Sequence, residues 1–310
     1  MFRAENKSVL VVMSSYNGEK YIKEQIDSIL KQEKVDVTLF IRDDGSNDTT
    51  SNIVEKYADE YPNVFCDIGE NWGFRRSFYN TLLSVKGNFD YYAFSDQDDV
   101  WDSEKLYKAV CCLENEKREV KLYASGLKVT DSNLNFMYEN KFPKLQIAYG
   151  SALSRQRLAG CTMVFSKELV NMCKLLKMTN EMGDLFSHDG AIYYICLACG
   201  GNVIFKEESY INFRRHGGTV TEHGKGYKKR ISSVLNIFGK NKNVRYMQNQ
   251  VLLNIFSDYM PADVKEVADM IAKYKNKFRY RMKMMFDSRI RCGLKSVDCI
   301  NFIAILLGCY

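Results

Sequence analysis

Hydrophobic residues in the first 120 positions of the chain follow two alternating patterns. Short runs rich in β-branched and aromatic residues occur at 8–14, 35–41, 64–67 and 90–95. Between them, over residues 19–30, 48–61, 74–85 and 103–116, apolar residues recur three and four positions apart, as on one face of a helix. Strands and helices that alternate in this way form a mainly parallel sheet flanked by helices. We therefore predict an α/β fold.

The rest of the chain has a weaker pattern. Strands are predicted at 122–129, 161–165 and 203–213, and helices at 167–177 and 188–199. Beyond a loop at 214–226, helical periodicity returns at 244–258 and 262–277. Because the composition becomes basic at this point, we expect a first domain over residues 1–224 and a basic, mainly helical extension over residues 225–310.

Charge divides the chain at the same place. The net charge is +6 over 310 residues. Residues 225–310 contain 17 Lys and Arg against 6 Asp and Glu, a net charge of +11, whereas residues 1–224 have a net charge of −5. No aromatic stacking motif of the RNA-binding kind accompanies the basic residues, so nucleic acid is not an expected partner. Two interpretations remain open: the extension binds an anionic membrane surface, or it packs on the first domain and exposes a solvated basic face.

Composition excludes several classes of protein. Hydrophobic residues make up 46% and charged residues 26%, which is ordinary for a globular protein and unlike a disordered one. No apolar run approaches the roughly 18–20 residues that span a bilayer, and the first apolar stretch does not resemble a signal peptide. We expect the ten cysteines to stay reduced in the cytoplasm. The single CxxC pair, Cys196 and Cys199, lacks the further ligands of a zinc site.

The densest acidic cluster follows the fourth predicted strand. Asp96, Asp98 and Asp99 lie within four residues, and their mutual repulsion is tolerable if a cation lies between them. Carboxylate oxygens favour Mg²⁺ or Mn²⁺, which commonly bridge substrate phosphates. An acidic turn that caps the next helix is the alternative, and the local pattern leaves both open.

Two further carboxylates follow the second predicted strand. Asp43 and Asp44 either form an Asx-type turn or accept the N3–H of a pyrimidine base. In open α/β sheets the ligand crevice lies at the carboxyl ends of the strands, so this pair and the Asp96 cluster should share one rim. No glycine-rich phosphate loop follows the first strand, and the phosphates of a nucleotide must be held in another way.

Two later segments offer catalytic residue types. Asp189 precedes an aromatic-rich helix, where an Asp is either a cap or a general base for a hydroxyl group. Arg214, Arg215 and His216 stand in a glycine-containing loop that could close as a lid. Two arginines suit pyrophosphate, and a neutral His suits an ion such as Mn²⁺, although a solvated basic turn has the same pattern.

Taken together, these segments resemble the family 2 glycosyltransferases with the GT-A fold, a Rossmann-like mixed, mainly parallel sheet. The resemblance covers residues 7–220 and rests on motifs that occur in the family's order. They are Ser15-Tyr16-Asn17-Gly18, residues 21–29, Asp43-Asp44-Gly45-Ser46, Asn71-Trp72-Gly73, residues 95–101, Gly160-Cys161-Thr162, His188-Asp189 and residues 214–218. The sequences SDQDDVW and RRHGG look most like the bacterial rhamnosyltransferase-like branch, which builds capsule or O-antigen polysaccharide.

The resemblance implies a role for each motif. Asp43 or Asp44 would hold the uracil or thymine ring. Asp98 would be the main ligand of Mn²⁺ or Mg²⁺, completed by Asp96 and His216, and Asp189 would deprotonate the acceptor in a single inverting displacement. The rest of the nucleotide site would comprise Ser15, Tyr16, Asn17, Asn71, Asp96, Arg214 and Arg215. Many relatives have Glu-Asp where this chain has His188-Asp189, so no role is implied for His188.

The same resemblance implies the partners. The donor would be a UDP- or dTDP-sugar. The acceptor would be a saccharide joined to a polyprenyl lipid, which would place the protein in the cytoplasm or peripherally on the inner face of the cell membrane. Two other classes remain open. A nucleotidyltransferase that makes the donor needs a phosphate loop after the first strand, and a non-catalytic membrane-associated saccharide-binding subunit needs neither Asp98 nor Asp189.

Overall fold

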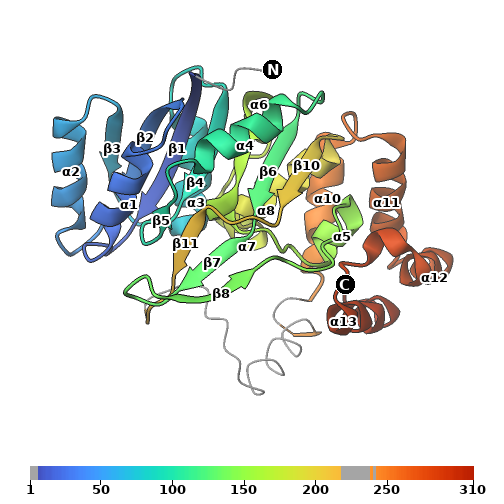
Figure 1. The fold of residues 1–310 in the computed structure, drawn as a ribbon. Helices are drawn as coiled ribbons and strands as arrows, with labels where there is room; N and C mark the ends of the chain where they lie inside the picture. Colours follow the sequence, from blue (N-terminus) through green and yellow to red (C-terminus); the bar gives the residue numbers. More distant parts are fainter. Residues whose placement is uncertain (1–5, 218–237, 240–241) are drawn as a thin grey trace. The chain divides into compact units, whose positions relative to one another are not determined.

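The computed structural model describes residues 6–217, 238–239 and 242–310, and their elements are drawn in Figure 1. The chain divides into two compact units. The first comprises 1–142, 158–192 and 201–216, and the second comprises 143–157, 193–200 and 217–310. Residues 143–157 and 193–200 thus group with the C-terminal residues, and the domain boundary at 224/225 stays a prediction.

A seven-stranded sheet forms the centre of the first unit. The order is β10-β6-β9-β4-β1-β2-β3, and the sheet is parallel except for β9, which runs antiparallel to β4 and β6. The strands are β1 (Lys7–Ser15), β2 (Val35–Asp43), β3 (Val64–Ile68), β4 (Tyr91–Ser95), β6 (Lys121–Ser125), β9 (Val164–Ser166) and β10 (Asn202–Lys206). The predicted mixed, mainly parallel sheet is confirmed.

Helices flank this sheet (Figure 1). They are α1 (Ile22–Leu30), α2 (Thr50–Glu60), α3 (Phe74–Ser84), α4 (Lys105–Glu114), α6 (Lys167–Cys173), α7 (Asn180–Leu185), α8 (His188–Ala198) and the 3₁₀ turn η1 (Gly160–Thr162). The predicted helical spacing has a direct structural cause. In α1, Ile22, Ile26 and Ile29 form one stripe and are fully buried, as are the side chains of β1 from Val9 to Met13. The first four predicted strands and helices are confirmed to within a few residues at their ends.

A second, four-stranded sheet explains two errors in the predicted strands. Its order is β5-β11-β7-β8, with β5 (Val100–Trp101), β7 (Leu127–Thr130), β8 (Phe136–Asn140) and β11 (Ile211–Arg214). The single strands predicted at 122–129 and 203–213 are each two strands that belong to different sheets. Gly126 lies at the first break, where an added Cβ would be 2.4 Å from the Glu207 carbonyl oxygen. The chain therefore passes from β6 to β7 through a close backbone approach that only glycine permits.

The described part of the second unit is helical. Its elements are α5 (Tyr149–Ser154), α10 (Val244–Phe256), α11 (Ala262–Lys273), α12 (Phe278–Phe286), η2 (Ser288–Ile290) and α13 (Lys295–Leu306). Leu252 and Phe256 of α10 and Ile271 of α11 are fully buried. The sequence predicted α10 and α11 but not α12 or α13. No helix among the described residues has both the length and the hydropathy to cross a membrane.

Candidate active site

The predicted rim exists at the carboxyl ends of four neighbouring parallel strands. β4, β1, β2 and β3 are adjacent in that order, and each is followed by a polar turn. The turns begin at Asp96, Tyr16, Asp44 and Gly69. Because Ser15 pairs with Asp43 and Met13 pairs with Ser95, these strands end at nearly the same level of the sheet.

The two carboxylates after β2 hold neighbouring turns in place. Asp43 is fully buried and accepts hydrogen bonds from the Ser15 hydroxyl (2.8 Å) and from the backbone and hydroxyl of Ser46 (2.9 and 2.7 Å). Asp44 accepts from the backbone N–H groups of Trp72 and Gly73 (2.9 and 2.8 Å). Both side chains therefore fix the shape of the rim, whatever further contact either makes with a base.

The predicted residues Asn17 and Asn71 also shape these turns. Asn17 has a positive φ of 48°, and its side-chain oxygen accepts from the backbone of Asn47 (2.8 Å). The Asn71 side chain accepts from the backbone of Gly73 (2.9 Å). Tyr16, in contrast, is 45% exposed, so its ring is available at the rim.

Gln97, which lies between Asp96 and Asp98 in the sequence, joins two turns. Its side-chain oxygen accepts from the Tyr16 N–H (2.9 Å), and its side-chain nitrogen donates to the Tyr16 carbonyl (3.0 Å). Gly18 leaves room for this amide, since an added Cβ would be 2.2 Å from the Gln97 Oε1 atom. The turn after β4 is thus fixed to the turn after β1.

Arg42 and Trp72 form a second feature that sequence reasoning missed. The buried Arg42 guanidinium lies 4.5 Å from the centre of the Trp72 ring and forms an ion pair with Asp67 at 3.0 Å. It also donates to the carbonyl oxygens of Asp43 and Glu70. Trp72 itself is 38% exposed. A cation stacked behind an aromatic ring fixes the orientation of that ring at the rim.

The carboxylates after β4 lie close to Asp189. Burial, and to a smaller extent the negative charges of Asp98 and Asp189, raise the pKa of Asp96 to about 7. The backbone of the Asp96 turn is supported from α1, where Gln25 donates to the Ser95 hydroxyl (2.7 Å) and that hydroxyl donates to the Asp96 carbonyl (2.9 Å). Asp98, in the turn after β4, and Asp189, in the first turn of α8, are therefore both close enough for their charges to act on Asp96.

A buried group of titratable side chains supports this turn. Ligand atoms of Asp96, Asp99 and Cys161 lie within 4.8 Å of one another. Lys105 of α4 is buried, its Nζ atom lies 3.4 Å from the centre of the Trp101 ring, and burial lowers its pKa to about 7. Burial likewise raises the pKa of the Asp99 carboxyl and of the Cys161 thiol.

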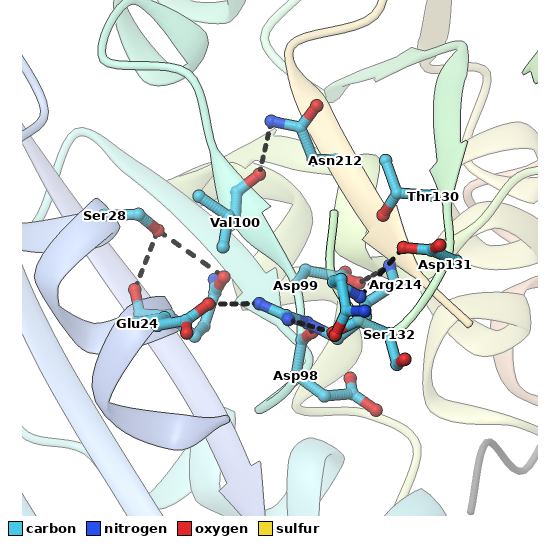
Figure 2. A network of polar contacts seen from close by, with 12 residues as sticks. Glu24, Ser28, Asp98, Asp99, Val100, Thr130, Asp131, Ser132, Asn212 and Arg214 are labelled. Carbon is cyan, nitrogen blue, oxygen red and sulfur yellow. Dashed lines mark hydrogen bonds and ion pairs between the residues drawn. The ribbon is translucent and has the colours of Figure 1, made fainter. Parts of the chain in front are cut away.

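Arg214 holds the last segment of the site against the rest of the unit, as Figure 2 shows. The side chain is 3% exposed and forms an ion pair with Glu24 of α1. Its Nε donates to the Asp98 carbonyl (2.9 Å), and its Nη1 donates to the Ser132 carbonyl (2.8 Å). Its backbone N–H donates to Asp99 (3.1 Å). A direct contact with a diphosphate, as the resemblance implied, would require this guanidinium to leave these partners, so the geometry favours a positioning role.

His216 reaches the carboxylates directly. Its Nε2 atom lies 2.8 Å from Asp98 Oδ2, and its ring packs on Tyr21 at 4.8 Å between centroids. The backbone of Arg215 donates to the Thr130 carbonyl (2.9 Å), and its side chain reaches the Tyr138 hydroxyl (3.4 Å). Gly218 of the predicted lid, and the basic residues at 225–230, lie outside the described residues.

The start of α8 separates the roles of three consecutive residues. The Gly190 N–H donates both to the Ser187 hydroxyl (3.2 Å) and to the Asp189 carboxylate (2.8 Å), so both side chains accept from the first turn of the helix. His188 is buried, stacks on Phe78 at 4.2 Å, and has its pKa lowered mainly by burial, so it is a neutral core residue at pH 7. Asp189 is half-buried in the first turn, and its charge acts on Asp96.

Comparison with known proteins identifies the family. The sequence model of glycosyl transferase family 2 matches residues 10–171, which contain most of the rim. The chain belongs to this family. It is 32% identical over 199 residues to the dTDP-rhamnosyl transferase RfbG of Shigella flexneri, covering 58% of this chain and 63% of that protein. It is also 25% identical over 217 residues to an uncharacterized glycosyltransferase of Nostoc, covering 67% and 65% of the two chains.

Solved structures confirm the fold. S. aureus TarS in complex with UDP-GlcNAc superposes with a TM-score of 0.54 at 16% identity, covering 98% of this chain and 93% of that one. The mannosyltransferase PcManGT from Pyrobaculum calidifontis, in complex with GDP-Man and Mn²⁺, gives 0.53 at 16% identity over 97% and 86%. The GT-A fold expected from the motifs is therefore confirmed.

The side chains at the rim fit a divalent cation. Asp98 and His216 provide a carboxylate oxygen and an imidazole nitrogen 2.8 Å apart, a donor pair that suits Mn²⁺. The alternative group around Cys161 suits Mn²⁺ or Mg²⁺ less well, because a thiolate is a soft ligand and these cations prefer oxygen and imidazole ligands. The ligand atom of Asp96 lies within 4.8 Å of those of Asp99 and Cys161, and the negative charge of Asp98 also acts on it, so Asp96 needs a positive charge nearby to stay ionised below pH 7.

Proposed function

We propose that the chain transfers a sugar, with inversion, from a UDP- or dTDP-activated donor to a saccharide acceptor in the synthesis of a bacterial cell-surface polysaccharide. The observation that carries the proposal is the convergence of Asp189 with Asp96 and Asp98 at the carboxyl ends of β4 and its parallel neighbours. Membership of glycosyl transferase family 2 and similarity to a dTDP-rhamnosyl transferase support it.

The donor's nucleoside would bind along the turns after β1, β2 and β3. Asp43 or Asp44 would accept the N3–H of the pyrimidine, while the exposed ring of Tyr16 supplies an apolar face for the base. The Trp72 ring, oriented by Arg42, stands on the same rim. The similarity to a transferase named for dTDP supports a thymine or uracil base in preference to a purine.

The diphosphate would lie near Asp98 and His216. A Mn²⁺ or Mg²⁺ ion held by Asp98, His216 and Asp96 would stabilise the negative charge of the departing nucleoside diphosphate. Arg214 positions both protein ligands, because it contacts the Asp98 carbonyl with its guanidinium and precedes His216 by two residues. Arg215 is then the arginine with a side chain nearer solvent, and we assign the direct diphosphate contact to it.

Asp189 would act as the general base. The acceptor hydroxyl oxygen forms the new bond to the anomeric carbon, and its proton passes to the Asp189 carboxylate. The bond from the anomeric carbon to the diphosphate oxygen breaks on the opposite face, and its electron pair leaves with the nucleoside diphosphate. One displacement of this kind inverts the anomeric configuration.

The acceptor is proposed to be a saccharide carried on a polyprenyl lipid. The basic C-terminal residues support this, since they suit a peripheral position on the anionic inner face of the cell membrane.

The test is a screen of UDP-, dTDP- and GDP-sugars with Mn²⁺, reading release of nucleoside diphosphate. We expect release from a UDP- or dTDP-sugar only, and loss of transfer in Asp189→Asn with donor binding retained. Asp184→Asn, a neighbouring exposed carboxylate, is the matched control and should remain active. Absence of release from every donor would contradict the enzyme assignment, and full activity in Asp189→Asn would remove this residue from the mechanism.

A further inference from the structure

Helix α13 presents an apolar stripe to solvent. The exposed positions repeat with the spacing i, i+3, i+4 and i+7, which is one face of a helix. They are Cys299, Phe302, Ile303 and Leu306, with Leu307 directly after the helix. The opposite face is buried and mainly apolar, with Ala304 and Ile305 beside Asn301. On an ordinary surface helix the outward face is polar, so the outward face of α13 has the chemistry of a contact surface.

The neighbouring helix α12 extends this stripe. Phe286 is 64% exposed, and its ring centroid lies 6.0 Å from that of Phe302 on α13. Phe278, two turns earlier on α12, is 68% exposed. Figure 1 shows α12 and α13 as adjacent short helices. The apolar surface of α12 and α13 comprises six exposed side chains: Phe278, Phe286, Phe302, Ile303, Leu306 and Leu307.

Positive charge accompanies the apolar surface. Residues 273–310 contain nine Lys and Arg and two Asp and Glu. Several of the basic residues are exposed on or beside α12 and α13: Lys277, Arg279, Lys283, Arg291 and Lys295. Lys283 is paired with Glu266 at 2.5 Å, but no ion pair of Lys277, Arg279, Arg291 or Lys295 is found among the described residues. The excess positive charge has no counterpart in this part of the second unit.

We propose that the apolar surface binds an anionic lipid bilayer. A 12-residue helix is about 18 Å long, which is too short to span but sufficient to lie in the plane of the interface. Aromatic and aliphatic side chains would enter the boundary between headgroups and acyl chains, and the lysines and arginines would contact anionic headgroups. A protein partner would need a matching apolar and acidic face, whereas a bilayer supplies both properties at once.

The proposal goes beyond the proposed transfer reaction. It assigns membrane contact to exposed apolar residues of α12 and α13, whereas charge alone would assign it to any basic segment. Because it rests on the second unit only, it can fail while the activity stands, and the activity can fail while lipid binding stands.

Vesicle flotation of the full chain tests the proposal. We expect the protein to float with vesicles of phosphatidylglycerol and phosphatidylcholine, to bind pure phosphatidylcholine weakly, and to lose binding at high salt. The double variant Ile303→Ser/Leu307→Ser should lower the partition coefficient at least about tenfold. Phe65→Ser/Leu175→Ser is the matched control, because these side chains are 50% and 45% exposed in the first unit.

A charge variant separates the two contributions. Arg279→Gln/Lys295→Gln should weaken binding to anionic vesicles several-fold and leave binding to neutral vesicles unchanged. Lys31→Gln/Lys117→Gln removes two exposed charges from the first unit and should have no such effect. Donor hydrolysis and the circular dichroism spectrum should stay as in the parent for all four variants.

Three outcomes would overturn the proposal. The first is a parent protein that does not float with anionic vesicles. The second is binding by Ile303→Ser/Leu307→Ser that equals that of its control. The third is a parent dimer that the same variant converts to a monomer, since the apolar surface would then be covered by a second copy of the chain.

Discussion

The Gln97 side chain and the Tyr16 peptide group exchange two hydrogen bonds of 2.9 and 3.0 Å. This pair joins the turn that follows β4 to the turn that follows β1. A residue that separates two site carboxylates in the sequence thus fixes the position of the segment proposed to bind the base.

Loss of the Gln97 amide should therefore weaken donor binding. We expect Gln97→Ala to raise the dissociation constant of the donor about tenfold, because two hydrogen bonds contribute roughly 1–3 kcal/mol together. Gly18→Ala should have a similar effect, since its new methyl group would displace the same amide. Calorimetry on both variants and on the double variant checks this. The double variant should be little worse than Gln97→Ala, and strictly additive losses would contradict a shared cause.

His216 and Asp98 should set the affinity for the cation. Replacing either residue with Ala or Asn removes the carboxylate or the imidazole from the pair of metal ligands that lie 2.8 Å apart. We expect the dissociation constant of Mn²⁺ to rise at least about tenfold. Electron paramagnetic resonance of free Mn²⁺ measures this without turnover. Cys161→Ala is the comparison variant. If it weakened Mn²⁺ binding as much as Asp98→Asn, the cation would belong to the group around Cys161.

Arg214→Lys should act mainly on stability. A lysine cannot donate to Glu24, the Asp98 carbonyl and the Ser132 carbonyl at the same time. We therefore expect the free energy of unfolding to fall by about 2 kcal/mol. Urea denaturation gives this value. Glu24→Gln should cost less, because the Glu24 side chain is 54% exposed. Arg215→Lys should leave stability unchanged and weaken diphosphate binding, and the reverse pattern in the two variants would exchange their roles.

His188 should make the folded state sensitive to acid. Its pKa in the folded state lies below the ordinary value of 6.5, mainly because of burial, so below pH 6.5 the unfolded chain binds the proton more readily. Stability should fall as pH drops from about 6.5 through the folded pKa, and be unaffected by this group at higher pH. Midpoints of urea unfolding, measured at pH 7.5 and 5.5 for the parent and for His188→Phe, isolate the contribution of His188 to this pH dependence. An equal loss of stability on acidification in the two proteins would contradict this prediction. Asp96, whose pKa is raised, contributes in the opposite direction, and comparing the variant with the parent cancels that contribution.

The sequence predicted those parts of the fold that have a regular period. Ile22, Ile26 and Ile29 repeat with the spacing of a helix face, and β1 is a continuous buried run, so both elements could be placed. Helix α13 could not, because it is apolar on both faces and therefore has no period to detect. The second sheet was missed for a different reason: the break at Gly126 depends on the carbonyl of Glu207, some eighty residues away.

The site was predictable where it follows strand ends. Asp43, Asp96 and Asp98 could be placed on one rim, because parallel strands end at the same edge of a sheet. The roles of Gln97, Arg42 and Arg214 depend on contacts between residues distant in the chain, and residue type alone does not reveal them. From the sequence alone, a buried Arg214 whose guanidinium has three partners cannot be distinguished from a solvent-exposed arginine that binds a phosphate.

The single antiparallel strand of the large sheet has a consequence for synthesis of the chain. β4, which carries the Asp96 turn, pairs with β1 on one side and with β9 on the other. β9 begins only at Val164, so a growing or truncated chain that ends earlier exposes one edge of β4, while its other edge is already able to pair with β1, and through it with β2 and β3 in turn. An open strand edge of this kind promotes association between chains. The smallest fragment of the first unit that can be expected to stay monomeric therefore extends past Ser166.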